Sequence, residues 1–350
     1  MPELRYDPIR SRWVIISTER ARRAHEYIRP REKPKVDVRS CPFCYGNEAK
    51  TPPEVFVIAP EGRQPNTSGW EVRVVPNKYP ALRIEGELKR EGLGIFDLVN
   101  GIGAHEVIIE SPQHDVSLAD LSVHHIQKVL IAYRERIRDL RKDVRFRYIL
   151  VFRNHGGEAG ASLSHPHSQL IATPIIPPVV VGELNTAREH YIRKERCIFC
   201  DLLKQELMLG DRIVYEDENY VEWTPFASAF PFETWLFPKK HLHDFALLND
   251  DELLELARVL KDMLLRIKTV LGDPPYNMVL HTAPSPHPRP GREYYWSTLQ
   301  YDYHWHIVLI PRLTRIAGFE WGSGLYINPT PPEEAAKYLR EAEVKVEDEA

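Results

Sequence analysis

An internal duplication in this 350-residue chain limits the folds that it can adopt. Each half begins with a C-x-x-C pair that encloses an aromatic residue, CPFC at 41–44 and CIFC at 197–200. An apolar segment that ends in histidine follows, at 105–114 in the first half and 232–241 in the second. Each half then has an amphipathic stretch, a strand-like run and a His-x-His sequence. A repeat of about 150 residues is too long for a solenoid and has the size of a domain, so we expect two homologous domains.

The amphipathic stretches predict one long helix in each half. Apolar residues recur there at three- and four-residue spacing, over 121–143 and again over 250–273. Short polar side chains at the start of each stretch can accept hydrogen bonds from the first free N–H groups of a helix. We therefore expect Asp120 to cap the first helix, and Asn249 or Asp250 to cap the second.

Strand-like runs follow both helices and complete the predicted fold. They lie at 147–154 and 276–282, and after a loop each half reaches a second strand that opens with its His-x-His. These elements predict an α+β fold in which each half is an antiparallel sheet with one long helix. The proline-rich segment at 173–178 marks the end of the first half. The expected domains are therefore 1–180 and 181–350.

The charge balance excludes some classes of partner. The chain carries 46 Lys and Arg against 50 Asp and Glu, a net charge of −4, which gives no global attraction to nucleic acid or to an anionic membrane. No apolar run approaches the roughly 18 to 20 residues that a membrane span needs, and the N-terminus lacks the apolar centre of a signal peptide. We expect a cytoplasmic protein that binds neither nucleic acid nor membrane.

The cysteines and their matching histidines predict two metal sites. All four cysteines lie in the two C-x-x-C pairs, which in a large cytosolic chain indicate metal or redox chemistry rather than disulfides. Structural zinc usually takes a close cysteine pair and two further ligands from elsewhere. The candidate zinc ligands are Cys41, Cys44, His114 and His165 in the first half, and Cys197, Cys200, His241 and His304 in the second. A buried or redox-active cysteine pair is the alternative for either C-x-x-C taken alone.

A rival ligand set exists in the second half. It has the oxygen and nitrogen donors of an iron-type site. Its members are Glu183, His281, His304 and His306.

The segment from 156 to 169 has the features of a reaction centre. Its glycines can bring backbone N–H groups close to phosphate oxygens, and it leads directly into a strand. Residues two apart on a strand face the same side, so His165 and His167 should project together, with Pro166 stiffening the link. If His165 binds zinc, His167 is held in place yet free to react. The alternative is that His167 is a second metal ligand or a buried, hydrogen-bonded histidine.

These motifs resemble one known family. The sequence HPHSQ at 165–169, the CPFC pair, SPQH at 111–114 and the two-repeat layout are similar to galactose-1-phosphate uridylyltransferases of the histidine-triad superfamily. The resemblance extends from RYDPIRSRW near the start to the helix expected after Pro332. It implies two tandem histidine-triad-like domains. It also implies an enzyme of galactose metabolism, a homodimer, that exchanges a uridylyl group between UDP-glucose, UDP-galactose and hexose 1-phosphates.

The resemblance also assigns roles to individual residues. It makes His167 the nucleophile that forms a uridylyl-histidine, and Gln169 a donor to the phosphoryl oxygens. Because Gln169 cannot protonate a leaving group as a histidine would, it favours a transferase over a hydrolase. The remaining substrate-binding residues implied by local matches are Arg20, Arg23, Asn77, Asn154, Gly160, Ser162, Phe319 and Gly322.

The chain also departs from the family pattern. The C-terminal segment at 318–336 lacks the basic, sugar-contacting stretch typical of bacterial uridylyltransferases and is more like relatives that act as ADP-sugar phosphate adenylyltransferases. Adenylyl transfer with the same histidine chemistry is therefore the main alternative. A second alternative is a nucleotide-binding protein that is stabilised by zinc and has no catalytic activity. Zinc is expected at both metal sites, with iron at the second as the less favoured choice.

Overall fold

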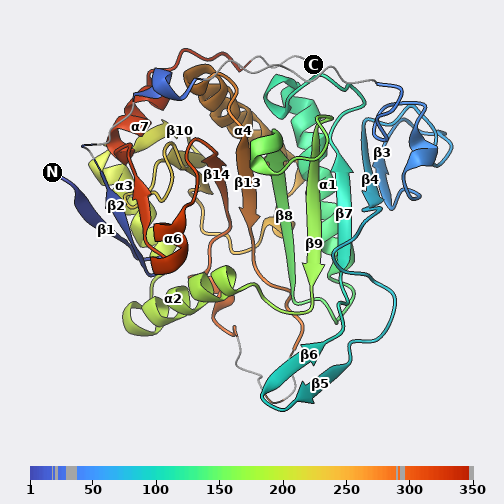
Figure 1. Ribbon diagram of the computed structural model, residues 1–350, viewed down its shortest axis with the longest axis horizontal. Coiled ribbons are helices and arrows are strands. Elements are labelled where there is room, and N and C mark those ends of the chain that lie inside the picture. The colour runs from blue at the N-terminus through green and yellow to red at the C-terminus, as the bar shows by residue number, and fades with distance from the viewer. Residues whose placement is uncertain (18, 20–22, 29–37, 289–290, 292–295, 347–350) are drawn as a thin grey trace.

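A single ten-stranded antiparallel sheet runs through both halves of the chain (Figure 1). The computed structural model describes residues 1–17, 19, 23–28, 38–288, 291 and 296–346. In sheet order the strands are β10 (Ile213–Glu216), β11 (Tyr220–Trp223), β12 (Thr234–Pro238), β14 (His306–Pro311), β13 (Tyr276–His281), β8 (Tyr148–His155), β9 (His167–Thr173), β7 (Ala104–Ile109), β4 (Val72–Pro76) and β3 (Phe56–Ile58).

In the part of the chain that the structure describes, two small sheets and several helices complete the fold. The small sheets contain β1 (Glu3–Asp7), β2 (Arg12–Ile16) and β15 (Tyr326–Asn328), and β5 (Arg90–Leu93) with β6 (Phe96–Val99). The α-helices are α1 (Val123–Leu140), α2 (Pro178–Lys194), α3 (Ile198–Leu209), α4 (Asp250–Leu271), α5 (Leu299–Asp302), α6 (Gly318–Ser323) and α7 (Pro332–Arg340). The 3₁₀ turns are η2 (Ala24–Tyr27), η3 (Glu48–Lys50), η4 (Leu118–Asp120), η5 (Gly157–Ala159) and η6 (Phe245–Leu247).

The large sheet repeats the duplication seen in the sequence. From the centre outward, the first half contributes β8, β9, β7, β4 and β3, and the second contributes β13, β14, β12, β11 and β10 in the corresponding positions. The α+β fold with antiparallel pairing and one long helix per half is therefore confirmed. The two half-sheets are joined where β8 pairs with β13, for example Val151 opposite Leu280. The boundary near residue 180 stays a prediction.

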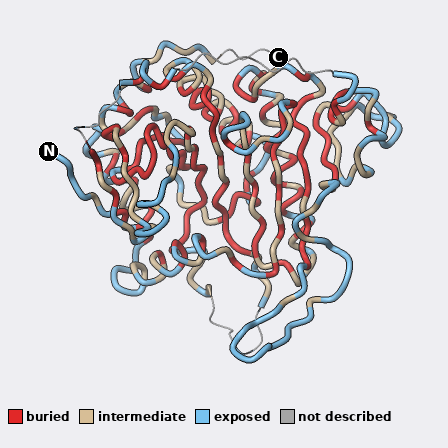
Figure 2. Tube along the Cα trace, viewed as in Figure 1, coloured by how far each residue is buried: buried red, intermediate tan, exposed pale blue. Residues whose placement is uncertain are grey.

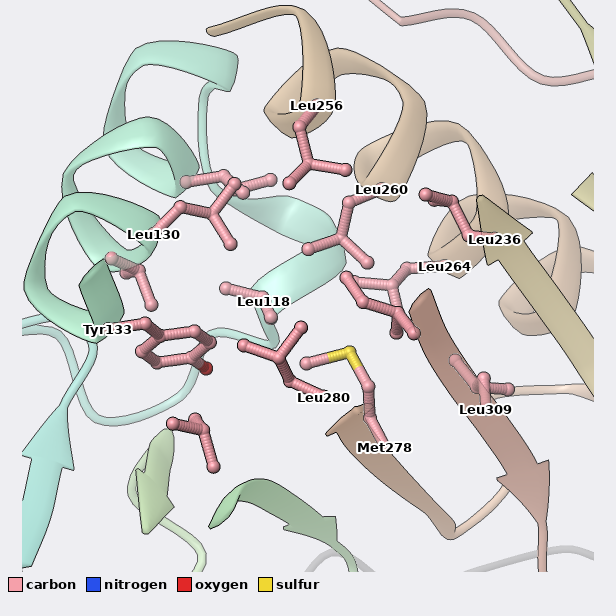
Figure 3. Close-up of a cluster of buried hydrophobic side chains, with 14 of the residues drawn as sticks. Leu118, Leu130, Tyr133, Leu236, Leu256, Leu260, Leu264, Met278, Leu280 and Leu309 are labelled. Atoms are coloured by element: carbon pink, nitrogen blue, oxygen red, sulfur yellow. The ribbon is translucent and has the colours of Figure 1, made fainter. Parts of the chain in front are cut away.

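The helices α1 and α4 lie side by side on one face of the sheet and share its largest core (Figure 3). Leu130 of α1 and Leu260 of α4 both belong to this cluster, as does Leu280 of β13. Burying such side chains contributes about 1.5–3 kcal/mol each. One core thus stabilises both halves.

One of the two helix caps differs from the prediction. Asn249 caps α4, and its side chain accepts a hydrogen bond from the Glu252 N–H. Asp120 does not cap α1. It ends the short turn η4 and bonds to Ser117, while Ser122 caps α1 two residues later. The Asp120 carboxylate therefore forms its hydrogen bonds within η4, before the helix, and not to the first N–H groups of α1 as the sequence pattern predicted.

The opposite face of the sheet is covered unequally. Over the second half, α2 and α3 bury a second core that includes Trp223, Trp235 and Phe237. Over the first half, the segment containing Phe43 covers the outer strands. Figure 2 shows the strands of the large sheet mostly buried and the β5–β6 hairpin exposed. Among the described residues, no helix is long and apolar enough to cross a membrane.

Strands β9 and β14 begin two residues later than predicted, at the second histidine of each His-x-His sequence. Regular pairing begins at His167 in β9 and at His306 in β14, so His165 and His304 lie just before the strands. Pro166 has no N–H to give to the sheet, which explains the delay in the first half. The His of each pair that lies outside its strand is the one predicted to bind metal.

A buried carboxyl group on β11 has no hydrogen-bonding partner. The side chain of Glu222 is fully buried, and within the described part of the chain neither of its oxygens forms a hydrogen bond. Burial raises the pKa of Glu222 well above its ordinary value of 4.5, and the carboxylate of Asp262 on α4 adds to this, while Arg266 opposes it. The folded chain therefore holds Glu222 protonated under conditions in which the unfolded chain ionises it.

We predict that Glu222→Gln makes stability less dependent on pH. Because the folded pKa is raised, the favourable contribution is complete below pH 4.5 and is lost as the pH rises through the folded pKa. In that window the wild type loses up to ~1.4 kcal/mol per pH unit. Urea unfolding at about pH 5 and about pH 8 measures this. The free energy of unfolding of Glu222→Gln, relative to that of the wild type, should be higher at the higher pH. The exposed Glu218→Gln serves as control, and parallel pH profiles of wild type and Glu222→Gln would contradict the prediction.

Candidate active site and metal centres

The ring of His167 is held by a hydrogen bond at one nitrogen, which leaves its other nitrogen free to react. Its side chain is only 6% exposed, and its Nδ1 lies 2.8 Å from the carbonyl oxygen of His165. A carbonyl oxygen can only accept, so Nδ1 carries the proton and Nε2 carries the lone pair. Burial lowers the pKa of His167, which keeps the ring neutral near pH 7. A neutral imidazole with a fixed tautomer is a competent nucleophile.

A buried ion pair holds the strand that carries His167. Glu110 follows β7 and is fully buried, and its two carboxylate oxygens share the single N–H of the Arg153 Nε, at 3.0 and 3.1 Å. Ser168, next to His167, donates to the same carboxylate. The backbone N–H of Glu110 also donates to the carbonyl of Pro166 at 3.1 Å. The two residues that flank His167 are therefore both attached to Glu110.

The first predicted metal-ligand set is brought together and buried. The ligand atoms of Cys41, Cys44, His114 and His165 all lie within 4.8 Å of one another. The Cys44 Sγ lies 3.2 Å from the His114 Nδ1 and 3.5 Å from the His165 Nδ1, and these two nitrogens are 3.3 Å apart. Tetrahedral zinc would require about 3.6 Å between sulfur and nitrogen and about 3.4 Å between nitrogens. The geometry fits one metal ion.

The far side of each histidine supports the same assignment. The His165 Nε2 lies 2.7 Å from the carbonyl oxygen of Ser111, and the His114 Nε2 lies 3.1 Å from the Ser164 Oγ. A proton on each Nε2 leaves each Nδ1 free to bind a cation. Burial lowers the pKa of His165 to about 4, so this ring is neutral as a ligand must be.

The second predicted set has the same arrangement. The ligand atoms of Cys197, Cys200, His241 and His304 also lie within 4.8 Å of one another. The Cys200 Sγ lies 3.2 Å from the His241 Nδ1 and 3.6 Å from the His304 Nδ1. Hydrogen bonding from Cys197, followed by the two histidines, lowers the pKa of Cys200, which favours the thiolate that binds metal.

The rival oxygen and nitrogen set is only partly assembled. Glu183, His281 and His306 form a third buried group that could hold a metal ion, with the Glu183 carboxylate 2.9 Å from the His281 Nδ1. His304 belongs to the cysteine set instead, because its Nδ1 faces Cys200. The two sets thus do not compete for the same histidine.

Two amide side chains lie on the same face of the sheet as His167. Gln169 is two residues further along β9, and its Oε1 lies 2.8 Å from the His105 Nε2. Asn154 on β8 accepts a hydrogen bond at 2.8 Å from Asn277, which also donates to the carbonyl of Ala159 at 2.9 Å. Both amide oxygens are therefore occupied.

The glycine-rich loop lies beside Asn154. Gly156 and Gly160 have φ angles of 81° and 92°, which glycine adopts at little cost. A Cβ on Gly160 would lie 3.6 Å from the Asn154 Nδ2, and Ser162 is exposed in the same loop. The structure thus places Gly160 beside Asn154 at the end of β8, with Ser162 exposed two residues further along the loop.

Other predicted residues lie elsewhere or outside the described chain. Asn77 is close to Gln169, because its Nδ2 lies 3.2 Å from the same His105 nitrogen. Arg23 is exposed at the start of η2, which packs on α4, and Arg20 lies outside the described residues. Phe319 and Gly322 lie on α6, whose main contact is with β15.

The sequence analysis missed His105 and Asn277, and it missed the Glu110–Arg153 pair. The pair had a readable signal, since each is a charge directly after a run of apolar residues (VIIES and ILVFRN). Such a charge in a buried strand requires a partner. His105 and Asn277 had no comparable signal.

Known protein families match this chain in two parts, which correspond to its two halves. Models of the galactose-1-phosphate uridyl transferase N-terminal and C-terminal domains match residues 1–177 and 183–341. The chain is 38% identical to ADP-glucose phosphorylase of Arabidopsis thaliana, across 97% of this chain and 93% of the relative. It is 30% identical to galactose-1-phosphate uridylyltransferase of Thermotoga maritima, across 99% and 100%.

Two solved structures share the whole fold. The crystal structure of ADP-glucose phosphorylase from Arabidopsis thaliana with bound ADP-glucose has a TM-score of 0.80 at 36% identity, covering 98% of this chain and 100% of that one. A structure described as uridylyltransferase has a TM-score of 0.73 at 32% identity, covering 97% of each chain.

We predict that each Cys/His group binds one metal ion independently. Cys41→Ser should lose the ion of the first group and keep that of the second, and Cys197→Ser should do the reverse, because the two groups share no ligand. Elemental analysis of the purified proteins measures this. Both variants should unfold at lower temperature, since a structural zinc site contributes on the order of 10 kcal/mol of apparent binding free energy. Equal metal content in wild type and both variants would contradict the prediction.

Proposed function

The chain belongs to the galactose-1-phosphate uridylyltransferase family, and on that premise we propose that it transfers a uridylyl group between UDP-glucose and a hexose 1-phosphate through His167. The family acts by nucleotidyl transfer. The observation that carries the assignment to His167 is its hydrogen bond to the His165 carbonyl, which leaves Nε2 as the reacting nitrogen. The finer choice of nucleotide and sugar is part of the proposal.

The proposed reaction is a double displacement. In the first step the His167 Nε2 attacks the α-phosphorus of UDP-glucose, the bond from that phosphorus to the bridging oxygen breaks, and glucose 1-phosphate leaves with its electron pair. In the second step a phosphate oxygen of galactose 1-phosphate attacks the same phosphorus. UDP-galactose then departs and the histidine regains its lone pair.

The residues around His167 support transfer without a general acid. A sugar phosphate leaves as a stable anion, so the transition state needs donors to the phosphoryl oxygens more than it needs a proton. The amide of Gln169 is one such donor, and Asn154, Gly160 and Ser162 lie within the same region. We extend the proposal to the family-implied roles of Asn77, Arg20, Arg23, Phe319 and Gly322, and to a cytoplasmic homodimer.

We assign zinc to both Cys/His groups. Two thiolates and two imidazoles form the donor set that zinc prefers, and when bound it supplies a rigid tetrahedral anchor. In the first half this anchor would fix His165, whose carbonyl orients His167. Iron held by Glu183, His281, His304 and His306 is the less favoured alternative for the second half, because it would require His304 to leave the cysteine group.

A second candidate is phosphorolysis of ADP-glucose. It is favoured by the 38% identity to ADP-glucose phosphorylase, against 30% to the uridylyltransferase from Thermotoga maritima. The chemistry at His167 would be the same, with inorganic phosphate as acceptor in the second step. Parallel assays of UDP-glucose with galactose 1-phosphate and of ADP-glucose with phosphate separate the two.

We predict that the protein labels itself when given the donor alone. Because the first step needs no acceptor, UDP-glucose labelled in the α-phosphate should yield a protein-bound UMP that is acid-labile and stable to base, as a phosphoramidate is. His167→Ala should take up no label. Labelling from ADP-glucose alone would favour the second candidate, and no labelling from either donor would refute nucleotidyl transfer through His167.

We also predict that Gln169→His shifts the enzyme toward hydrolysis. A histidine at this position can protonate a leaving group or activate water, whereas glutamine only donates hydrogen bonds. The ratio of free nucleoside monophosphate to transferred nucleotide should rise while total turnover falls. Gln169→Asn, which keeps an amide, is the control. If the ratio does not change in Gln169→His, Gln169 has only a structural role.

A further inference from the structure

The two ends of the Gln169 amide have opposite chemistry. Its NH₂ group would stabilise the oxygens of a phosphoryl group, and its carbonyl oxygen would repel them. Rotation of the amide by half a turn exchanges the two ends at almost no steric cost. Something in the protein must therefore select the productive orientation.

The neighbour that contacts this amide is His105. On β7, His105 pairs with Ile171 of β9, so it lies diagonally across from Gln169 on the same face of the sheet. Its Nε2 lies 2.8 Å from the Gln169 Oε1. Contact between these two side chains follows from the register of the two strands.

A backbone group fixes the tautomer of His105. The N–H of Ala81 points at the His105 Nδ1 at 3.1 Å, and a backbone N–H can only donate. The Nδ1 is therefore the acceptor, and the proton of the neutral ring lies on Nε2. The NH₂ of Asn77 lies 3.2 Å from the same Nε2, because the Asn77 Oδ1 accepts from the Tyr79 N–H. An NH₂ group can only donate, so this contact suits the opposite tautomer. It is the longest of the three contacts to the ring, and the two shorter ones, at 3.1 and 2.8 Å, fit a proton on Nε2.

The tautomer in turn fixes Gln169. The His105 Nε2–H needs an acceptor, so the Gln169 carbonyl oxygen must face it. The amide nitrogen of Gln169 forms no hydrogen bond to any described residue of the chain. It is left free on the face that carries His167, two residues back along the strand.

We propose that His105 is a positioning residue that holds the Gln169 amide with its NH₂ group toward the transferred phosphoryl group. The proposal deepens the proposed function and rests on nucleotidyl transfer at His167. The order of contacts runs from the Ala81 N–H through the imidazole of His105 to the amide of Gln169, and each contact dictates the polarity of the next.

The second amide beside the nucleophile is held in the same way. Asn277 donates to the carbonyl oxygen of Ala159, which can only accept, so its NH₂ is the end that faces Asn154. The Oδ1 of Asn154 is thereby occupied and its Nδ2 faces Gly160. In both cases a backbone group sets the orientation of the amide through one intervening side chain, His105 for Gln169 and Asn277 for Asn154.

The test compares His105→Phe with His105→Gln. Phenylalanine keeps the ring but removes the donor, whereas glutamine restores an N–H that can reach the amide. Single-turnover formation of the nucleotidyl-histidine, with whichever of UDP-glucose or ADP-glucose labels the wild type, should slow by about 10- to 100-fold in His105→Phe. The apparent Kd for the nucleotide sugar should change by less than about 3-fold, because the lost hydrogen bond stabilises the transition state and not the bound substrate. His105→Gln should recover part of the rate.

A double-mutant cycle separates positioning from general damage. In a Gln169→Ala background, His105→Phe should cause no further loss, because the group that it positions is already gone. An additive loss in that background would overturn the proposal, and so would adduct formation by His105→Phe at the wild-type rate. A wild type that forms no adduct refutes the proposed function instead, so the two failures are distinguishable.

A spectroscopic measurement keeps the proposal testable even if His105→Phe does not fold. Long-range ¹H–¹⁵N spectra of wild-type protein labelled at its histidines report which ring nitrogen carries the proton. The signal that disappears in His105→Gln belongs to His105. At about pH 8, an Nε2–H tautomer supports the proposal and an Nδ1–H tautomer overturns it.

Discussion

The buried ion pair between Glu110 and Arg153 holds together the strands that carry the proposed nucleophile and its neighbours. Both side chains are almost completely buried, at 0% and 2% exposure, so the pair has exchanged hydration for an ion pair in which one N–H of Arg153 is shared by both oxygens of Glu110. Breaking such a pair by removing one partner typically costs about 3–5 kcal/mol. Arg153 also donates to the Tyr276 hydroxyl at 2.8 Å, and Ser168 bonds to both Glu110 and Tyr133. Strands β7, β8, β9 and β13 and helix α1 thus meet at one charge pair directly beneath His167.

The comparison of the two halves separates scaffold from chemistry. His306 repeats the contact of His167, since its Nδ1 lies 3.0 Å from the His304 carbonyl oxygen. The position of Gln169 is occupied by Val308 in the second half, and His306 is packed between aromatic rings with no exposure. The second half therefore keeps the metal-binding geometry and the histidine tautomer. At the position of Gln169 it has no amide donor, and its histidine is buried away from any substrate.

The sequence predicted what repeats, and it missed what is set by register. The duplication, both long helices and the two Cys/His groups could be predicted because each leaves a periodic or spaced pattern in the chain. The joining of the half-sheets could not, because β8 and β13 have the same apolar composition whether they pair with each other or form separate edges. The contact of His105 with Gln169 depends on which residues of β7 and β9 lie diagonally opposite. The role of Ser122 as cap depends on a short turn that no periodicity marks.

The junction of β8 with β13 has a consequence for synthesis of the chain on the ribosome. Strand β8 ends at His155, but the strand that pairs with its free side ends only at His281. Translation at about 5–20 residues per second therefore leaves the open edge of the nascent first half unpaired for several seconds. An unpaired apolar edge is a template for association with other chains. The interval in which this protein is most prone to aggregate should thus fall during translation of its second half, before β13 emerges.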